Sequence, residues 1–229
     1  MAALDYLSQN PLLHMGMIVP VKRGTAQILY AAGDGVCMVE TKSGAYMLSV
    51  SSLETGRMLL ERLPAEGLFS FHQDFMLEDF KNKIRHSTIL ENYQATYLSQ
   101  KPLPDLCGIQ IKSLDMSYFK VIMETYDVDV GEGYLKKRLE DGELFGGFVD
   151  ADMVGFIGIH AEGSIGMLKV FDPFLGRGYG TALTSHAVNH QLSQGIVPFE
   201  QIGIDNEASL AIARKLGFSI SEDKVYWLF

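Results

Sequence analysis

The sequence predicts an α/β (α+β) fold, in which a mixed, mostly antiparallel sheet is flanked by helices and a smaller α/β domain comes first. Three observations support this. Short segments alternate between apolar and polar residues and are separated by Gly/Asp turns, which indicates antiparallel hairpins. In the last third, strand patterns alternate with helix patterns, which indicates a parallel crossover. The 229 residues are 47% hydrophobic, enough to form a core for one or two domains.

A polar segment with two prolines, 99–105 (SQKPLPD), divides the chain into nearly equal halves. We therefore expect an N-terminal α/β domain over residues 1–104 and a second domain over residues 105–229. The strand–helix order around LFSFHQDF (68–75) suggests that the first domain is a degenerate copy of the second, without its glycine loop.

In the first half, alternation and turn residues predict strands at 26–30, 36–40, 45–50, 67–72 and 92–98. Helices are predicted at 51–63 and 76–84. Ser51 is followed three residues later by Glu54, a capping box that marks the start of the first helix.

In the second half, helices are predicted at 113–126, 132–142, 179–192 and 206–218. Strands are predicted at 144–150, 151–163, 164–172, 199–204 and 224–229. Asn206 has the character of a helix N-cap, and Gly217 that of a helix end.

Charge and composition argue against several classes of partner. The net charge is −9, and the basic runs 81–86 and 135–141 are short and edged by acids, so we expect solvated helix faces and no nucleic-acid partner. No signal peptide or membrane-length apolar run is evident, so we expect a cytoplasmic protein that does not bind membranes. Cys37 and Cys107 lack metal-ligand spacing, which fits a reduced protein without a bound metal.

The most informative segment is VFDPFLGRGYGTAL, residues 170–183. Gly176, Gly178 and Gly180 lie between a strand pattern and a helix pattern, an arrangement that binds anions at the helix N-terminus. A Walker loop is absent, and a Rossmann fingerprint fails because Thr181 stands where its third glycine belongs. A tight structural turn is the remaining alternative.

A second motif follows about 25 residues later. The segment IGIDNEASLAIARKLGF (202–218) fits the pattern N-x-x-S-x-x-x-x-x-K-x-G-F from Asn206 onward. With LGRGYG (175–180), this motif resembles the GNAT superfamily of acyl-CoA-dependent N-acyltransferases. The resemblance covers about Cys107 to Phe229 and is nearest to the glycine N-acyltransferase-like branch, whose members carry an extra N-terminal domain.

The resemblance implies that acetyl-CoA, or another acyl-CoA, is the co-substrate and that no metal takes part. A primary amine or amino-acid-like acceptor would attack the thioester directly in a ternary complex. The strand before the loop would pair with pantetheine, and one of its N–H groups would stabilise the oxyanion. The implied coenzyme A contacts are Leu168, Lys169, Val170, Gly176, Arg177, Gly178, Tyr179, Gly180, Thr181 and Asn206.

The sequence departs from the family pattern at two places. Leu175 replaces the usual Gln or Arg that opens the loop, and the spacing from Pro173 is one residue short. The tyrosine that often protonates the leaving thiolate is Ala213 here. This second departure keeps a rival reading open, a module that binds or senses coenzyme A without turnover. An enzyme that binds a nucleotide at GRGYG is a more distant rival.

Glu162 lies where a general base is often found in the family, at the start of the strand that enters the site, and His160 is the backup base. The alternatives are a surface turn acid and a histidine at the edge of the core. His186 and His190 have a zinc-compatible spacing but no third ligand in the sequence, which favours a solvated helix face. For Tyr226 and Trp227 we expect a place in the core rather than at the rim of an acceptor pocket.

Overall fold

A computed structural model of the chain describes residues 2–86, 88–104, 108–126, 128 and 131–229. The chain forms two compact units. Unit 1 comprises Met1–Thr96, Gln201–Leu210 and Ser219–Phe229, and unit 2 comprises Tyr97–Glu200 and Ala211–Phe218. These units are spatial, so the expected sequence boundary between residues 104 and 105 stays a prediction. Cys107 lies outside the described residues.

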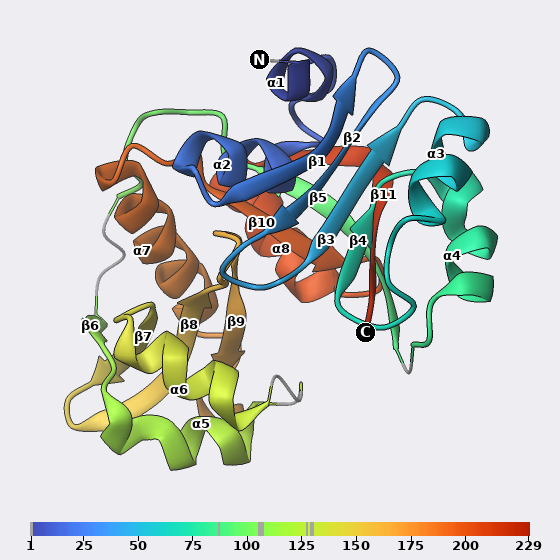
Figure 1. Ribbon diagram of the computed structural model, residues 1–229. Helices are drawn as coiled ribbons and strands as arrows, with labels where there is room; N and C mark the ends of the chain where they lie inside the picture. Colours follow the sequence, from blue (N-terminus) through green and yellow to red (C-terminus); the bar gives the residue numbers. More distant parts are fainter. Residues whose placement is uncertain (1, 87, 105–107, 127, 129–130) are drawn as a thin grey trace. The chain divides into compact units, whose positions relative to one another are not determined.

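Unit 1 is a sheet with helices on both faces (Figure 1). Its helices are α1 (Ala2–Leu7), α2 (Met15–Arg23), α3 (Leu53–Leu60) and α4 (Leu77–Lys83), with a short η1 (Asp74–Met76). Its strands are β1 (Ala26–Ala32), β2 (Gly35–Glu40), β3 (Tyr46–Val50), β4 (Phe69–Phe71), β5 (Ile89–Thr96) and β11 (Ser219–Leu228). They are ordered β1-β2-β3-β4-β11-β5, and only β3 and β4 pair in parallel.

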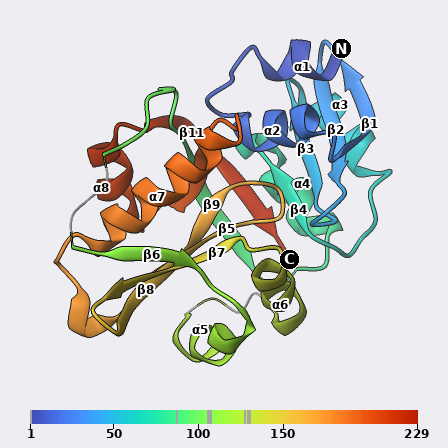
Figure 2. The ribbon, with the colours of Figure 1, turned by 90° about the vertical axis from the view of Figure 1, so that its left-hand side faces the viewer.

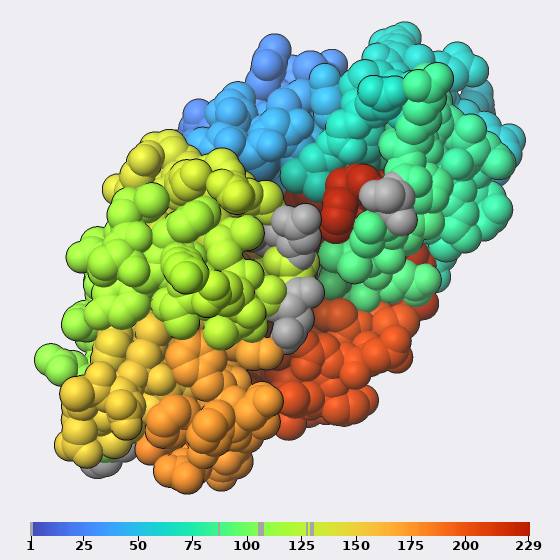
Figure 3. Space-filling model, turned by 90° about the horizontal axis from the view of Figure 1, so that it is seen from below, coloured from blue at the N-terminus to red at the C-terminus, as the bar shows by residue number. Residues whose placement is uncertain are grey.

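The core of unit 1 includes residues from both ends of the chain. Phe71 stacks on Phe80 of α4, with 4.1 Å between ring centroids, and on Tyr226 of β11, at 4.9 Å. In Figure 3 the red C-terminal residues accordingly lie against blue-green residues of the first half. Tyr226 and Trp227 are both buried, so the prediction that they belong to the core is confirmed.

Unit 2 is built on the strands β6 (Gln110–Ser113), β7 (Leu144–Val149), β8 (Asp152–Ile159) and β9 (Ile165–Val170). Between β6 and β7 come η2 (Met116–Tyr118), α5 (Phe119–Thr125) and α6 (Glu132–Glu140); after β9 come η3 (Asp172–Phe174) and α7 (Tyr179–Ser193). Helix α7 packs on one face of the sheet, and α5 and α6 cover the other (Figure 2).

Two elements cross the division between the units. β10 (Phe199–Gly203) begins in unit 2 beside β9 and ends in unit 1, and α8 (Glu207–Leu216) begins in unit 1 and ends in unit 2. Asn206 caps α8, since its Oδ1 accepts the Ser209 N–H at 3.1 Å, and Gly217 follows the helix with φ +86°. Both predicted ends of this helix are therefore confirmed.

The order of elements repeats along the chain. The series α1-α2-β1-β2-β3-α3-β4-α4-β5 has the same succession of helices and strands as α5-α6-β7-β8-β9-α7-β10-α8-β11. The third and fourth strands of each series pair in parallel across a helix. This repetition is what a degenerate copy predicts.

Helices α1 and α2 and the short strand β6 were not predicted from the sequence. Helix α2 contains Pro20, a helix breaker that hides its pattern. The capping box was placed one residue early, because Ser52, not Ser51, caps α3 by accepting the Thr55 N–H at 3.2 Å. The mostly antiparallel sheet and the parallel crossover in the second half are as predicted, and the structure adds a second crossover from β3 to β4.

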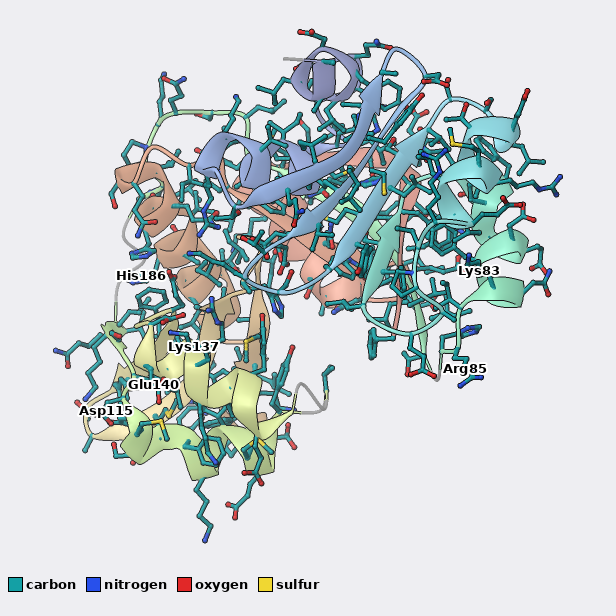
Figure 4. All side chains as sticks on the ribbon, in the orientation of Figure 1. Lys83, Arg85, Asp115, Lys137, Glu140 and His186 are labelled. Atoms are coloured by element: carbon teal, nitrogen blue, oxygen red, sulfur yellow. The ribbon has the colours of Figure 1, made fainter. Side chains whose placement is uncertain are left out.

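The two basic runs lie on helix surfaces and pair with acids. Lys81 bonds Glu78 at 2.9 Å, and Lys137 bonds Asp141 at 2.5 Å. Figure 4 labels Lys83 and Arg85 near the end of α4; Lys83 donates to the Glu61 carbonyl at 2.7 Å, and Arg85 reaches Glu66 at 2.7 Å. Exposed pairs of this kind add little stability. The run 135–141 departs from the expected solvated face at Arg138, which is buried and bonds Asp141 at 2.5 Å.

Candidate functional site

The glycine loop joins η3 to α7 within unit 2. Gly176 and Gly178 have φ values of +74° and +84°, a left-handed backbone that side chains with a Cβ rarely adopt. A Cβ at either position would meet no atom within 4 Å, so the space beside both residues is open. The two glycines are therefore required by the turn itself, and the turn leaves room beside the backbone.

The backbone N–H groups from Gly176 to Thr181 donate to no acceptor within the described part of the chain. The first bond of helix α7 is donated by Ala182, to the Gly178 carbonyl at 3.1 Å. No side chain caps this end of the 15-residue helix. Free N–H groups and the positive end of a helix dipole together attract an anion.

Gly180 serves a different purpose from the other two glycines. A Cβ there would lie 3.1 Å from Cδ1 of Ile212 in α8 and 3.6 Å from Cγ2 of Val170 in β9. The third glycine lets α7 approach the strand and the neighbouring helix. Gly180 would contribute its N–H group to a ligand site, and its close packing holds the start of α7 in place.

β9 carries a bulge immediately before the loop. Gly166 pairs with Gly158, and Lys169 pairs with Phe156. Between these two pairs β9 therefore has one residue more than β8. Met167, in the bulge, has φ +53° and is buried in the core under α5 and α6. A non-glycine residue at positive φ stores strain, and such residues concentrate at functional sites.

On its other edge, β9 pairs with β10 at its first residue. The two parallel strands share one register pair, Ile165 with Glu200. Lys169 is half-buried and pairs with Phe156 of β8, and in the described part of the chain the half-buried Leu168 and Val170 form no register pair with β10. That this part of β9 pairs with an extended ligand, as the family resemblance implies, stays a prediction.

The other predicted coenzyme A contacts differ in exposure. Arg177 is exposed, and its guanidinium lies 5.7 Å from the centre of the Phe174 ring. Tyr179 is half-buried and its ring is 6.3 Å from that of Phe174, whereas Thr181 is buried. Asn206 is exposed in unit 1, where its side chain caps α8. Of its two predicted roles, contact with pantetheine or capping, the structure shows the cap.

Glu162 and His160 occupy the turn between β8 and β9. Glu162 is 7% exposed, and its Oε1 accepts the Ser164 hydroxyl at 2.5 Å. The turn is closed by the His160 N–H, which donates to the Ser164 carbonyl at 2.8 Å. Glu162 is therefore a buried carboxylate, and the reading of it as a surface turn acid is wrong.

Tyr134 of α6 joins these two residues, and the sequence analysis did not single it out. Its hydroxyl oxygen accepts the Ala161 N–H at 3.1 Å and lies 2.9 Å from Nδ1 of His160. Burial, and next the charge of Glu162, raise the pKa of Tyr134 above its ordinary range, so the phenol keeps its proton. Its position in an amphipathic helix gave no signal, because the contact is made across 26 residues.

His186 and His190 both pack against Phe145, with ring centroids 4.9 and 4.8 Å away. His190 also lies 2.9 Å from Nε2 of Gln194. Figure 4 shows His186 on α7. Among the described residues, no group of three or more His, Cys, Asp or Glu side chains could hold a metal ion. In the same part of the chain, no helix is long and apolar enough to cross a membrane.

At the corresponding place in unit 1, the chain's own side chains bond the backbone N–H groups. Where β3 leaves β4, the Gln73 carboxamide accepts the Val50 N–H and donates to Ser49 Oγ, both at 3.0 Å. At the start of α3, Ser52 caps the helix and the Asp34 carboxylate accepts the Thr55 hydroxyl at 2.7 Å. No glycine loop is present there.

A bulged strand that leads through a glycine loop into a helix is the arrangement of the GNAT fold. Residues 146–228 match the family model described as FR47-like protein. The chain has the GNAT fold, and the glycine N-acyltransferase-like branch stays a prediction. Comparison of the sequence with curated proteins finds no match.

Solved structures agree with this fold. An X-ray structure of a Drosophila protein superposes with a TM-score of 0.73 and 13% identity, covering 99% of this chain and 94% of the other. A GCN5-related N-acetyltransferase-like protein from Streptococcus suis gives 0.57 and 12%, covering 100% and 99%. A GNAT-family acetyltransferase from Colwellia psychrerythraea gives 0.54 and 14%, covering 100% and 98%.

Proposed function

We propose that the protein is an N-acyltransferase that moves an acetyl or other short acyl group from acyl-CoA to a primary amine. The observation that carries the proposal is the run of backbone N–H groups from Gly176 to Thr181, which have no acceptor in the described part of the chain and lie at the start of α7, shortly after β9. A pyrophosphate requires such donors, and a pantetheine arm requires a strand edge.

The residues present fit acyl-CoA. The pyrophosphate would lie over Gly176 and Gly178, where the backbone is open, with Arg177 adding a charge-assisted contact. The pantetheine amides would pair with Leu168, Lys169 and Val170. A backbone N–H of this edge would then donate to the thioester oxygen as negative charge develops on it.

The acceptor amine reaches the site mostly as an ammonium at neutral pH, and only its neutral form attacks. Glu162 is the proposed proton acceptor, directly or through a water molecule, because its Oε2 has no hydrogen-bond partner among the described residues. Attack forms the N–C bond and a tetrahedral intermediate. Collapse of the intermediate breaks the C–S bond and releases the coenzyme A thiolate.

The leaving thiolate has no tyrosine acid at the usual place, since Ala213 is fully buried in α8. A thiol with a pKa near 8.5 is a fair leaving group, so its sulfur can be protonated by water after departure. The same residue is the observation that favours the alternative, a module that binds coenzyme A and does not turn it over.

Release of free thiol from acetyl-CoA, screened across amines, amino acids and polyamines, tests the proposal. We expect continuous thiol release that depends on one class of amine. Acetyl-CoA binding without release in any amine would instead support the binding module. Preferential binding of ATP or NAD would overturn both readings. Gly178→Val serves as the control for release that does not involve the loop.

A further inference from the structure

The side chains around the β8–β9 turn determine where the proton of His160 lies. The Ala161 N–H can only donate, so it uses one lone pair of the Tyr134 hydroxyl oxygen, 3.1 Å away. The phenol has one proton to place. Within the described part of the chain, the nearby acceptor for that proton is Nδ1 of His160, at 2.9 Å.

The opposite arrangement is less favourable. If Nδ1 carried the proton, it would donate to the phenol oxygen, and the phenolic proton would lose this acceptor. An unsatisfied donor in a half-buried position shifts such an equilibrium by about tenfold or more. Tyr134 therefore selects the neutral histidine that carries its proton on Nε2.

The packing of the ring confirms that it is held in place. A Cβ on residue 166 would lie 2.4 Å from Nε2 of His160 and 2.6 Å from its Cδ2, so the ring fits only over Gly166. The rings of Tyr134 and His160 stack with centroids 6.1 Å apart. The Arg138 guanidinium lies 5.7 Å from the Tyr134 ring centre, on the same helix. Nε2 has no hydrogen-bond partner among the described residues.

We propose that Tyr134 is a positioning residue that fixes His160 as a hydrogen-bond donor through Nε2–H, directed to an oxygen or sulfur atom of the substrate. This inference rests on the proposed function and refines it. His160, named from the sequence as the backup base, has its basic nitrogen engaged by Tyr134. Proton acceptance then falls to Glu162.

The test is the tautomer of His160 in the unliganded protein, read from two-bond ¹H–¹⁵N correlations of histidine-labelled samples at mildly alkaline pH. The spectrum of His160→Gln assigns the signal. We expect the Nε2–H form to exceed the Nδ1–H form by about tenfold or more. In Tyr134→Phe the ratio falls to that of the same histidine in urea-unfolded protein.

Tyr118→Phe is the matched control, since Tyr118 is a partly buried tyrosine of the same unit whose ring packs on Phe148. It leaves the ratio unchanged. A mainly Nδ1–H histidine in the wild type overturns the inference even if Tyr134→Phe fails to fold, and so does an unchanged ratio in folded Tyr134→Phe. The measurement needs no substrate, so a protein without transferase activity would overturn the proposed function and still give a clear tautomer.

Discussion

Gly178→Val separates the binding role of the loop from its folding role. The residue has φ +84°, and a left-handed conformation costs an L-residue about 1–2 kcal/mol, with more for a β-branched side chain. A Cβ meets nothing within 4 Å, so no steric clash adds to this cost. Domain stabilities are about 5–15 kcal/mol, so the variant stays folded.

The same side chain fills the space that we assign to the pyrophosphate. We expect the affinity for coenzyme A to fall by about 100-fold or more, which corresponds to about 2.7 kcal/mol. Isothermal titration calorimetry measures the affinity, and thermal unfolding confirms that the variant is folded. If Gly178→Val does not fold, Gly178→Ala repeats the test with a smaller side chain.

Gly195→Val is the matched control. Gly195 follows the other end of α7, has φ +71° and likewise has open space at its Cβ position. It therefore carries a similar backbone cost, and the account predicts unchanged affinity for coenzyme A. Equal affinity in folded Gly178→Val and wild type would refute the assignment of the loop, whatever the control shows.

Four further predictions follow from the same structure. Arg177→Ala should weaken coenzyme A by about 1.5–3 kcal/mol and leave pantetheine fragments without a pyrophosphate unaffected; equal losses would place Arg177 elsewhere. Glu162→Gln should lower turnover about 100-fold at neutral pH with little change in acyl-CoA affinity, and less so at high pH, whereas His160→Ala should be milder. Because side chains of unit 1 bond the backbone N–H groups at the corresponding place, calorimetry should give one coenzyme A per chain, and a second site would contradict this. Burial lowers the pKa of His72 to about 3 and also lowers the pKa of His14, so the unfolded chain takes up these protons before the folded chain does as pH falls below about 6.5. Urea unfolding should show that the free energy of unfolding falls by about 2 kcal/mol through His72 between pH 7 and 5. His72→Gln should lack this loss.

Much of the fold could be predicted because local patterns and the final structure agree. The hairpin of β1 and β2, the crossover from β9 to β10 and both ends of α8 follow from alternation, glycine and capping residues. Helix α2 was hidden by Pro20, and β6 is a four-residue strand with little burial. The place of β11 beside β4 could not be predicted, because no local pattern specifies a partner 150 residues away.

The site was predictable to a lesser extent. The glycine loop stood out because Gly176 and Gly178 must adopt positive φ, and Gly180 must allow a close approach. The bulge at Met167 left no trace, since methionine gives no sign of a left-handed backbone. Tyr134 could not be found because its role depends on packing between α6 and the β8–β9 turn, which a single sequence does not reveal.

Amide hydrogen exchange at residues 176–181, with and without acetyl-CoA, tests the central claim most directly. These N–H groups have no acceptor in the described part of the chain, so they should exchange rapidly in the free protein. If the loop holds the pyrophosphate, saturating acetyl-CoA slows exchange there by about tenfold or more, and Gly178→Val abolishes the effect. Unchanged exchange across 176–181 in protein that calorimetry shows to be saturated with acetyl-CoA would contradict the account.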